Sequence, residues 1–368
     1  MKLDPNEKPG HFIDPIFGKI WLKDTAGLEQ TADLRGRTCS KLTTWFEVDS
    51  QGRAWLCCPG WLPYSIGNVL TESIHDIWHG ERATALRNQI ITGDWRYCQH
   101  ALCPSIVSDN LPFKVSNTVN VPDLPTKINF SNDESCNLAC PSCRVQKIIF
   151  TNGAEYEKRK RINDILVKAF LTEQTTRYFE INVTGSGDAF ASKIFRNMLF
   201  NIDGSLFPNC VINLQTNGTL LNQRNWNAIS KIHQNLKLIK ISFDAAHEST
   251  YNNIRVHGKW KQLVENCKQL EDKKGILPKL SVHYDYVVQA DNYQEMTEFV
   301  EFVKENFPTF DAINFSLVTD WGTWSPAVYE EKCIWKPSHP EFEKFQSVIS
   351  DPMFTDPKIN MGNIRVRN

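Results

Sequence analysis

The sequence predicts an α/β fold in which a small cysteine-rich domain precedes a partial barrel of six parallel strands. Short β-branched or aromatic segments alternate with amphipathic helical segments over residues 127–325, and this pair recurs six times. The stretch before residue 111 is instead rich in Cys, Trp, Gly and Pro, with only short apolar runs. Right-handed crossovers place such strands in parallel under helices, and six units are too few for a closed eight-stranded barrel. We therefore expect an open, TIM-like (β/α)6 barrel.

The elements of the barrel follow from the sequence pattern. The expected strands are short and apolar enough to be buried in a parallel sheet, and they are residues 127–132, 179–184, 209–216, 236–244, 280–289 and 312–318. Helical periodicity is clearest in Ile162, Ile165, Leu166, Ala169 and Phe170, which fall on one face of a helix. Further helices are expected around residues 189–201, 223–233, 260–272 and 293–306.

Composition and turn residues divide the chain. Residues 111–126 carry three prolines and little helical periodicity, which predicts a linker. The expected organisation is an N-terminal extension (1–38), a Cys-rich domain (39–110), the linker (111–126), the barrel (127–325) and a helical C-terminal tail (326–368).

Charge and cysteine content narrow the class of protein. A net charge of −1 gives no electrostatic reason to expect nucleic acid or an anionic membrane as a partner. No apolar run approaches the ~18 residues of a membrane span, and acidic residues follow Met1 where a signal peptide would be apolar. We therefore expect a cytoplasmic protein. Eleven cysteines in a reducing compartment indicate metal ligation or catalysis rather than disulfides.

A three-cysteine motif follows the first expected strand of the barrel. Cys136, Cys140 and Cys143 have the spacing C-x3-C-x2-C, and no fourth cysteine lies nearby. Three thiolates can ligate three irons of a four-iron cluster and leave one iron open to another ligand. The alternative is a zinc knuckle that takes a distant fourth ligand. The position after a strand favours an active site, because α/β enzymes build their sites at the carboxyl ends of strands.

With this motif the sequence resembles the radical S-adenosylmethionine (SAM) superfamily, over most of residues 127–325. The resemblance implies that the open iron binds SAM, and that polar groups at later strand ends hold the cofactor. Gly185, Ser186, Gly187 and Asp188 resemble the Gly-Gly-Glu segment of that superfamily, although Ser186 and Asp188 depart from its usual residues. A tight turn with a helix N-cap is the alternative for this segment.

The other implied SAM contacts also follow strands. Thr216 and Asn217 resemble the superfamily's Thr-Asn-Gly segment, whereas Ser242, Asp244 and Arg255 resemble groups that hold the ribose and carboxylate of SAM. A solvated helix face is the alternative for Arg255. The aromatic residue that often precedes the third cysteine in the superfamily is replaced here by Ser142, so that adenine packing must come from elsewhere.

The N-terminal cysteines form a second pattern. Cys39, Gly52 and Cys57 have the spacing C-x12-G-x4-C, which resembles the opening of the SPASM or twitch domain, an auxiliary-cluster domain of many radical SAM enzymes. The resemblance implies one further four-iron cluster held by Cys39, Cys57, Cys98 and Cys103, in a domain that unusually precedes the barrel. We expect a hairpin turning at residues 49–52, with Cys39 and Cys57 facing each other across its strands. Cys58 as the ligand in place of Cys57, and a four-cysteine zinc site, remain alternatives.

The last cysteines are assigned by their surroundings. Cys210 and Cys267 lie in apolar strand and helix patterns and are expected in the core. Cys333 follows the last strand, and a thiol there can donate a hydrogen atom to a substrate radical, as in radical SAM epimerases. Packing as a small apolar residue is its alternative.

The resemblance implies an enzyme that cleaves SAM reductively to a 5′-deoxyadenosyl radical and abstracts a hydrogen atom from its substrate. Flavodoxin or ferredoxin is the expected electron donor. The first 38 residues look too short and irregular for a peptide-recognition domain, so we expect oxidation or epimerisation of a sugar-like small molecule, with modification of a ribosomally made peptide as the alternative. A non-catalytic, zinc-stabilised binding module is the rival from another class.

Overall fold

Two compact units make up the chain. The computed structural model describes residues 11–21, 34–100, 103–116 and 118–364, and the chain divides into Met1–Ile128 and Asn129–Asn368. Parts of the expected N-terminal extension, residues 1–10 and 22–33, lie outside the described residues, as do residues 365–368 of the expected tail. Within the described residues, no helix is both long and apolar enough to cross a lipid bilayer.

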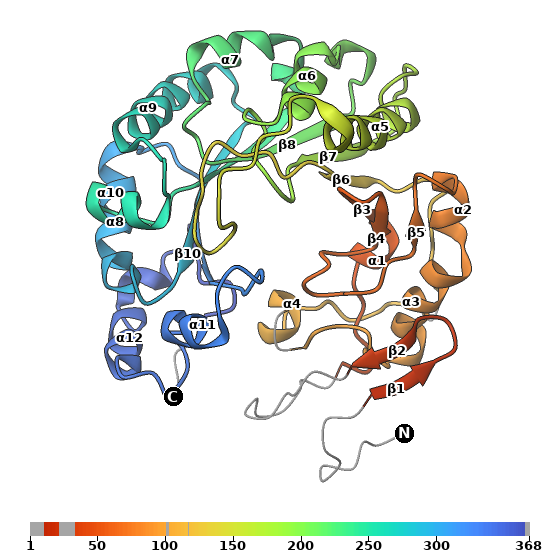
Figure 1. Cartoon of the computed structure of the whole chain (residues 1–368), viewed down its shortest axis with the longest axis horizontal. Helices are drawn as coiled ribbons and strands as arrows, with labels where there is room; N and C mark the ends of the chain where they lie inside the picture. Colours follow the sequence, from red (N-terminus) through yellow and green to blue (C-terminus); the bar gives the residue numbers. More distant parts are fainter. Residues whose placement is uncertain (1–10, 22–33, 101–102, 117, 365–368) are drawn as a thin grey trace. The chain divides into compact units, whose positions relative to one another are not determined.

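The second unit is built on a curved parallel sheet (Figure 1). Its strands lie in the order β12-β11-β10-β9-β8-β7-β6, and β7 to β12 pair in parallel with their neighbours. The strands are β6 (Lys127–Ser131), β7 (Phe179–Val183), β8 (Cys210–Thr216), β9 (Leu236–Ser242), β10 (Ser281–Val288), β11 (Ala312–Leu317) and β12 (Ile359–Asn360). The α/β fold class is therefore confirmed, with each of the six expected strands found to within two residues.

Helices connect these strands and cover the outer face of the sheet (Figure 1). They are α5 (Gly153–Phe170), α6 (Lys193–Asn201), α7 (Gln223–Ala228), α8 (Glu248–Ile254), α9 (Trp260–Ile276) and α10 (Met296–Asn306), with short 3₁₀ turns between some of them. The tail 326–368, expected to be helical, contains α11 (Pro326–Lys332) and α12 (Phe342–Ile349) but also the edge strand β12. Two residues are too short a strand for a sequence pattern to reveal, so tertiary pairing with β11 decides β12.

Aromatic side chains fill the layer between the sheet and its outer helices. The Phe243 ring lies 5.3–6.4 Å from the rings of Tyr251, Trp260, Tyr284, Phe299, Phe302 and Phe307. Tyr284, Tyr286 and Phe315 point to this side from β10 and β11, and each is almost fully buried. Because side chains alternate along a strand, the residues between them point to the inner face of the sheet.

That inner face carries polar side chains. Asn182 of β7 accepts a hydrogen bond from Asn213 of β8 (3.0 Å). Asp285 of β10 accepts one from Asn314 of β11 (2.7 Å) and lies 3.7 Å from the ammonium of Lys240 on β9. These five side chains, which we call the inner polar row, are half-buried. The sheet is thus apolar toward its helices and polar toward its inner face.

The first unit is smaller and has short elements. Strand β1 (His11–Asp14) pairs antiparallel with β2 (Gly18–Trp21). After α1 (Lys41–Thr44), strands β3 (Trp45–Asp49), β4 (Arg53–Trp55) and β5 (Gly67–Asn68) form an antiparallel set, followed by α2 (Ile74–His79), α3 (Glu81–Thr92) and α4 (Pro104–Val107). The expected hairpin turn is present, since the Gly52 amide donates to the Asp49 carbonyl (3.0 Å).

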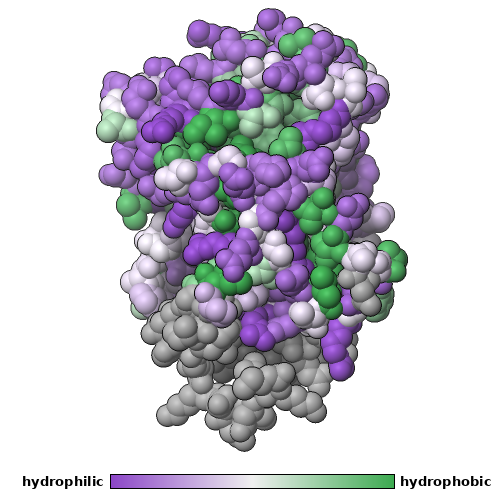
Figure 2. Space-filling model, turned by 90° about the vertical axis from the view of Figure 1, so that its right-hand side faces the viewer, coloured by the Kyte–Doolittle hydropathy of each residue, from purple (hydrophilic) through white to green (hydrophobic). Residues whose placement is uncertain are grey.

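The face of the molecule in Figure 2 is mainly hydrophilic, with apolar residues in small separate groups. Such scattered apolar groups are ordinary for a folded surface.

Candidate functional site

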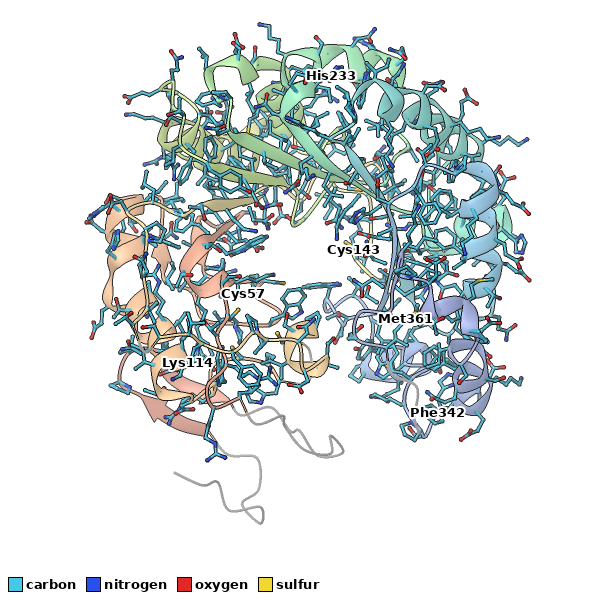
Figure 3. All side chains as sticks on the ribbon, turned by 180° about the vertical axis from the view of Figure 1, so that it is seen from behind. Cys57, Lys114, Cys143, His233, Phe342 and Met361 are labelled. Carbon is cyan, nitrogen blue, oxygen red and sulfur yellow. The ribbon has the colours of Figure 1, made fainter. Side chains whose placement is uncertain are left out.

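The three-cysteine motif lies in the loop that follows β6, on the inner side of the sheet (Figure 3). Cys136 pairs with Ile148 in an isolated antiparallel bridge, its amide donating to the Ile148 carbonyl (2.8 Å). The Cys140 carbonyl accepts from the amides of Cys143 and Arg144 (2.9 Å each), so that a tight turn joins the second and third cysteines. Cys136 and Cys140 are buried, whereas Cys143 is exposed.

A buried carboxylate anchors this loop. One oxygen of Asp133 accepts from the amide (3.0 Å) and the hydroxyl (2.8 Å) of Ser135, and the other accepts from the hydroxyl of Ser192 (2.6 Å). Burial raises the pKa of Asp133, while these serine hydrogen bonds oppose the rise. Sequence reasoning missed Asp133, because a single Asp after a strand carries no distinctive spacing.

Each motif sulfur lies near N–H groups of the chain. Cys136 faces the Leu138 amide (3.4 Å) and the Asn217 side-chain amide (3.6 Å). Cys140 faces the Arg255 guanidinium (3.7 Å). Cys143 faces the Arg144 guanidinium (3.3 Å). These donors lie where the negative charge of metal-bound thiolates would be.

Burial disfavours the charged form of the Cys136 and Cys140 thiols. Burial, joined by the Asp188 charge, raises the pKa of Cys136 to about 12, and Arg144 opposes the rise. Burial also raises the pKa of Cys140, which Arg255 opposes. A bound metal reverses this situation, because coordination deprotonates a thiol outright. Three soft donors in one loop, with cations beside them, fit an iron–sulfur cluster held by Cys136, Cys140 and Cys143.

Two glycines let the loop after β7 approach the cysteine loop. A Cβ on Gly185 would lie 1.9 Å from the Ser131 hydroxyl oxygen. A Cβ on Gly187, whose φ is +72°, would lie 2.4 Å from the Asp133 carbonyl oxygen. Any side chain here would push the two strand ends apart. Ser186 ties the same loops together, since its hydroxyl donates to the Ser131 carbonyl (2.8 Å).

Asp188 connects two strand ends. One oxygen accepts from the amides of Phe190 (3.0 Å) and Ala191 (2.9 Å). The other accepts from the Thr216 hydroxyl (2.7 Å) and the Asn217 amide (2.8 Å). The side chain is buried. Asp188 therefore acts as a clamp between the end of β7 and the end of β8, and it brings Thr216 and Asn217 beside the cysteine loop.

Asp244 and Arg255, both expected to hold SAM, form an ion pair with each other. Asp244 follows β9 with a φ of +65° and accepts from the Val287 amide (2.8 Å) and the Arg255 guanidinium (2.5 Å). Burial raises the pKa of Asp244, and the positive charge of Arg255 opposes this rise. Burial lowers the pKa of Arg255, but Asp244 and Cys140 raise it by more, so that the pKa of Arg255 is raised. Ser242 is the last residue of β9. Arg255 thus spans from the end of β9 to Cys140.

Cys333 ends α11 and is fully buried. Helix α11 lies against the carboxyl ends of β10 and β11, because the Lys332 carbonyl accepts from the Ala290 amide (3.2 Å) and Tyr329 lies beside the Val318 carbonyl (3.5 Å). Burial raises the pKa of Cys333 to about 11. Cys333 therefore lies on the predicted side of the barrel but is packed among other side chains. Cys210 and Cys267 are also buried, as expected for core residues.

The first unit gathers its own cysteines. The thiols of Cys39, Cys57, Cys98 and Cys103 interact electrostatically with one another. Burial raises the pKa of Cys39, Cys57 and Cys98. Four soft thiol donors fit one further iron–sulfur cluster. Within the described parts of the chain, no group of three or more His, Cys, Asp or Glu side chains is placed to hold a single metal ion.

One detail of the expected hairpin is wrong. Cys39 and Cys57 do not face each other across paired strands, because α1 separates Cys39 from β3 and β4 ends at Trp55. Loops bring them together instead. Cys58 lies in different surroundings from Cys57: burial and the Glu47 carboxylate raise its pKa to about 11, and the amides of Gly60 and Trp61 donate to its sulfur. Cys57, and not Cys58, is among the cysteines that act most strongly on Cys98, together with Cys39 and Cys103.

Comparison with known proteins bears on the N-terminal domain. Residues 39–104 match SPASM, an iron–sulfur cluster-binding domain. The chain carries a SPASM domain. The predicted iron–sulfur domain ahead of the barrel is thereby confirmed. None of the curated proteins searched matches the chain.

Solved structures are similar to parts of the chain. SuiB of Streptococcus suis bound to S-adenosylmethionine is 12% identical over 62% of this chain and 44% of SuiB, with a TM-score of 0.37. The same protein bound to its precursor peptide SuiA is 13% identical over 89% of this chain and 72% of SuiB, with a TM-score of 0.39. The anSMEcpe structure with bound AdoMet and the Cp18Cys peptide is 17% identical over 61% of this chain and 58% of anSMEcpe, with a TM-score of 0.43.

The clamp role of Asp188 predicts a loss of stability when its second carboxylate oxygen is replaced. In Asp188→Asn, an NH2 group faces N–H donors, and we expect the metal-free, SAM-free protein to lose about 1–3 kcal/mol of unfolding free energy. Urea denaturation measures this loss, with Asp272→Asn on the exposed face of α9 as the control, expected within about 0.5 kcal/mol of wild type. Unchanged stability of Asp188→Asn would show that Asp188 is not a clamp.

Proposed function

We propose that the second unit performs radical SAM chemistry at the loop after β6. The observation that carries the proposal is the set of three thiols, Cys136, Cys140 and Cys143, at the carboxyl end of β6, each with an N–H donor beside its sulfur. Three protein thiolates leave one iron of a four-iron cluster for another ligand. When bound there, SAM supplies a carbon-centred radical that abstracts a hydrogen atom.

The chain's own residues hold and orient these groups. The three cysteines would ligate the cluster, and we assign SAM binding to the strand-end residues Gly185, Ser186, Gly187, Asp188, Thr216, Asn217, Ser242, Asp244 and Arg255. The polar side chains at these strand ends, Asn217 and Arg255 among them, suit the polar ends of an amino acid. Because Asp188 already accepts four hydrogen bonds, its part in that binding is to position Thr216 and Asn217.

The SPASM domain would hold the auxiliary cluster through Cys39, Cys57, Cys98 and Cys103. We propose flavodoxin or ferredoxin as electron donor and the cytoplasm as location, since clusters and free thiols persist in a reducing compartment. A zinc-stabilised binding module is the rival, and it explains the cysteines but not the cationic donors around an open three-thiol loop. Absorbance near ~400 nm after anaerobic purification separates the two, because zinc has a filled d shell and is colourless.

For the substrate, we place a ribosomally made peptide ahead of a sugar-like small molecule. The first 38 residues, which look irregular in the sequence, contain the β1–β2 hairpin. They therefore give no reason to place a sugar ahead of a peptide. The inner polar row supports a substrate rich in hydrogen-bonding groups, because it presents amide, ammonium and carboxylate side chains that are half-buried.

The iron content tests the proposed clusters. We expect about eight iron atoms per chain after anaerobic reconstitution, from two four-iron clusters. Changing Cys136, Cys140 and Cys143 together to Ala should leave about four irons and abolish 5′-deoxyadenosine formation, since only the SPASM cluster would remain. The matched control, Cys210→Ala, removes a core cysteine and should retain the iron of both clusters. Normal SAM cleavage by the triple variant would contradict the assignment.

The substrate class is tested by the stimulation of SAM cleavage. Reconstituted enzyme, SAM and a reductant are incubated with peptides encoded by short reading frames beside the gene, or with monosaccharides and aminocyclitols. We expect a peptide to raise 5′-deoxyadenosine formation above the background, because a bound substrate traps the radical productively. The triple cysteine variant is the control and should respond to neither. If a sugar stimulates SAM cleavage and no peptide does, the substrate is a sugar-like small molecule and the peptide proposal is wrong.

The fate of the substrate radical is tested at Cys333. We propose oxidation, with the auxiliary cluster as electron acceptor, because the Cys333 thiol is fully buried. In heavy water, the expected product is lighter by two hydrogens and carries no solvent deuterium at the reacting carbon, and Cys333→Ala should retain turnover. A deuterated product of unchanged oxidation state, lost in Cys333→Ala, would instead establish epimerisation through the thiol.

A further inference from the structure

Two buried guanidinium groups reach the cysteine loop, and their charges are balanced differently. Arg255 lies 3.7 Å from the Cys140 sulfur and pairs with the Asp244 carboxylate at 2.5 Å. Arg144 lies 3.3 Å from the Cys143 sulfur, and its other terminal nitrogen donates to the Glu134 carbonyl (2.6 Å). The positive charge of Arg255 is thus neutralised by a carboxylate, whereas the contacts of Arg144 are a sulfur and a neutral carbonyl.

Among the ion pairs of the described residues, none joins Arg144 to the Glu134 carboxylate. It binds Arg159, which lies 2.8 Å from it and also pairs with Glu155. Of the two hydrogen-bond acceptors of the Arg144 guanidinium, the Cys143 sulfur at 3.3 Å is the one that can carry a negative charge. Because a bound metal deprotonates a thiol, the metal-loaded cysteine motif becomes the counter-charge of Arg144.

Burial makes this charge effective. Arg144 is only 8% exposed, and its hydrogen bond to the loop backbone holds the guanidinium in one position. Water screens such a charge poorly. Reduction adds one negative charge to a cluster, so a fixed cation beside a ligand sulfur stabilises the reduced form over the oxidised form.

We propose that Arg144 is a positioning residue that holds Cys143 on the cluster and raises the cluster's reduction potential, which eases electron uptake from a physiological donor. This inference rests on the proposed function, since it requires a cluster at Cys136, Cys140 and Cys143. It assigns to the residue after the third cysteine an electrostatic task for which Arg255 and Arg159 are less suited, because each of them is paired with a carboxylate.

The experiment is a potentiometric titration followed by electron paramagnetic resonance. Only the cluster with an open iron changes its signal when SAM is added, so this response singles it out from the SPASM cluster. Arg144→Gln removes the charge and keeps a hydrogen-bonding group, whereas Arg144→Lys keeps the charge. Lys147→Gln is the matched control, because Lys147 is an exposed cation three residues further along the same loop.

We expect the potential of Arg144→Gln to shift to more negative values, that of Arg144→Lys to shift less, and that of Lys147→Gln to equal wild type. A fully loaded Arg144→Gln protein at the wild-type potential would overturn the inference. If Arg144→Gln fails to retain the cluster, Arg144→Lys decides: a potential near wild type supports the inference, and one far below it overturns it, since the charge is still present.

These failures are distinguishable from failure of the proposed function. If wild-type protein shows no cluster that responds to SAM, the proposed function is wrong. If it shows such a cluster and its potential is independent of Arg144, only the electrostatic role of Arg144 is wrong. Iron content per chain is measured alongside, so that a loss of cluster is not mistaken for a shift in potential.

Discussion

The close packing of the loop after β6 against the loop after β7 is the constraint on which the site depends. The carboxylate of Asp133 holds Ser135 on its own loop and Ser192 at the start of α6. Gly185 and Gly187 remove the side chains that would keep the two strand ends apart. Buried hydrogen bonds without competing water make this junction rigid. A cysteine loop attached to it needs little further ordering when it ligates a cluster.

Beyond that junction, the site is organised by charge. Burial is unfavourable to the charged form of the two inner thiols, as the raised pKa of Cys136 and Cys140 shows. N–H donors lie beside the sulfurs and offset this effect. They come from four places: the loop backbone at Leu138, the end of β8, the segment after α8 and the residue after the third cysteine. Each donor comes from an element that the parallel sheet brings to the same edge. The fold thus supplies the electrostatic surroundings that an iron–sulfur cluster requires.

Much of the fold could be predicted because the relevant signals are local. The six barrel strands follow from short apolar runs, and α5 follows from a stripe that begins at Ile162. Strand β12 could not be predicted, since two residues carry no pattern and pairing with β11 alone defines it. The positions of Cys39 and Cys57 relative to each other could not be predicted either. Their separation along the chain was compatible with a hairpin, but α1 and the end of β4 place both in loops.

For the site, the sequence by itself determined which residue types are available and where strands end: the cysteine spacing of both motifs, the glycines after β7 and the polar residues after β8 and β9. Residues within one loop are close together in the sequence, so that their spacing can be recognised without a structure. Only the tertiary structure decided which of these groups meet. Asp188 clamps Thr216 and Asn217, Arg255 reaches Cys140 across 115 positions of sequence, and Arg144 is left with the thiols as its counter-charge. Such long-range contacts depend on how parallel strands align at one edge of a sheet, which packing determines and no spacing records.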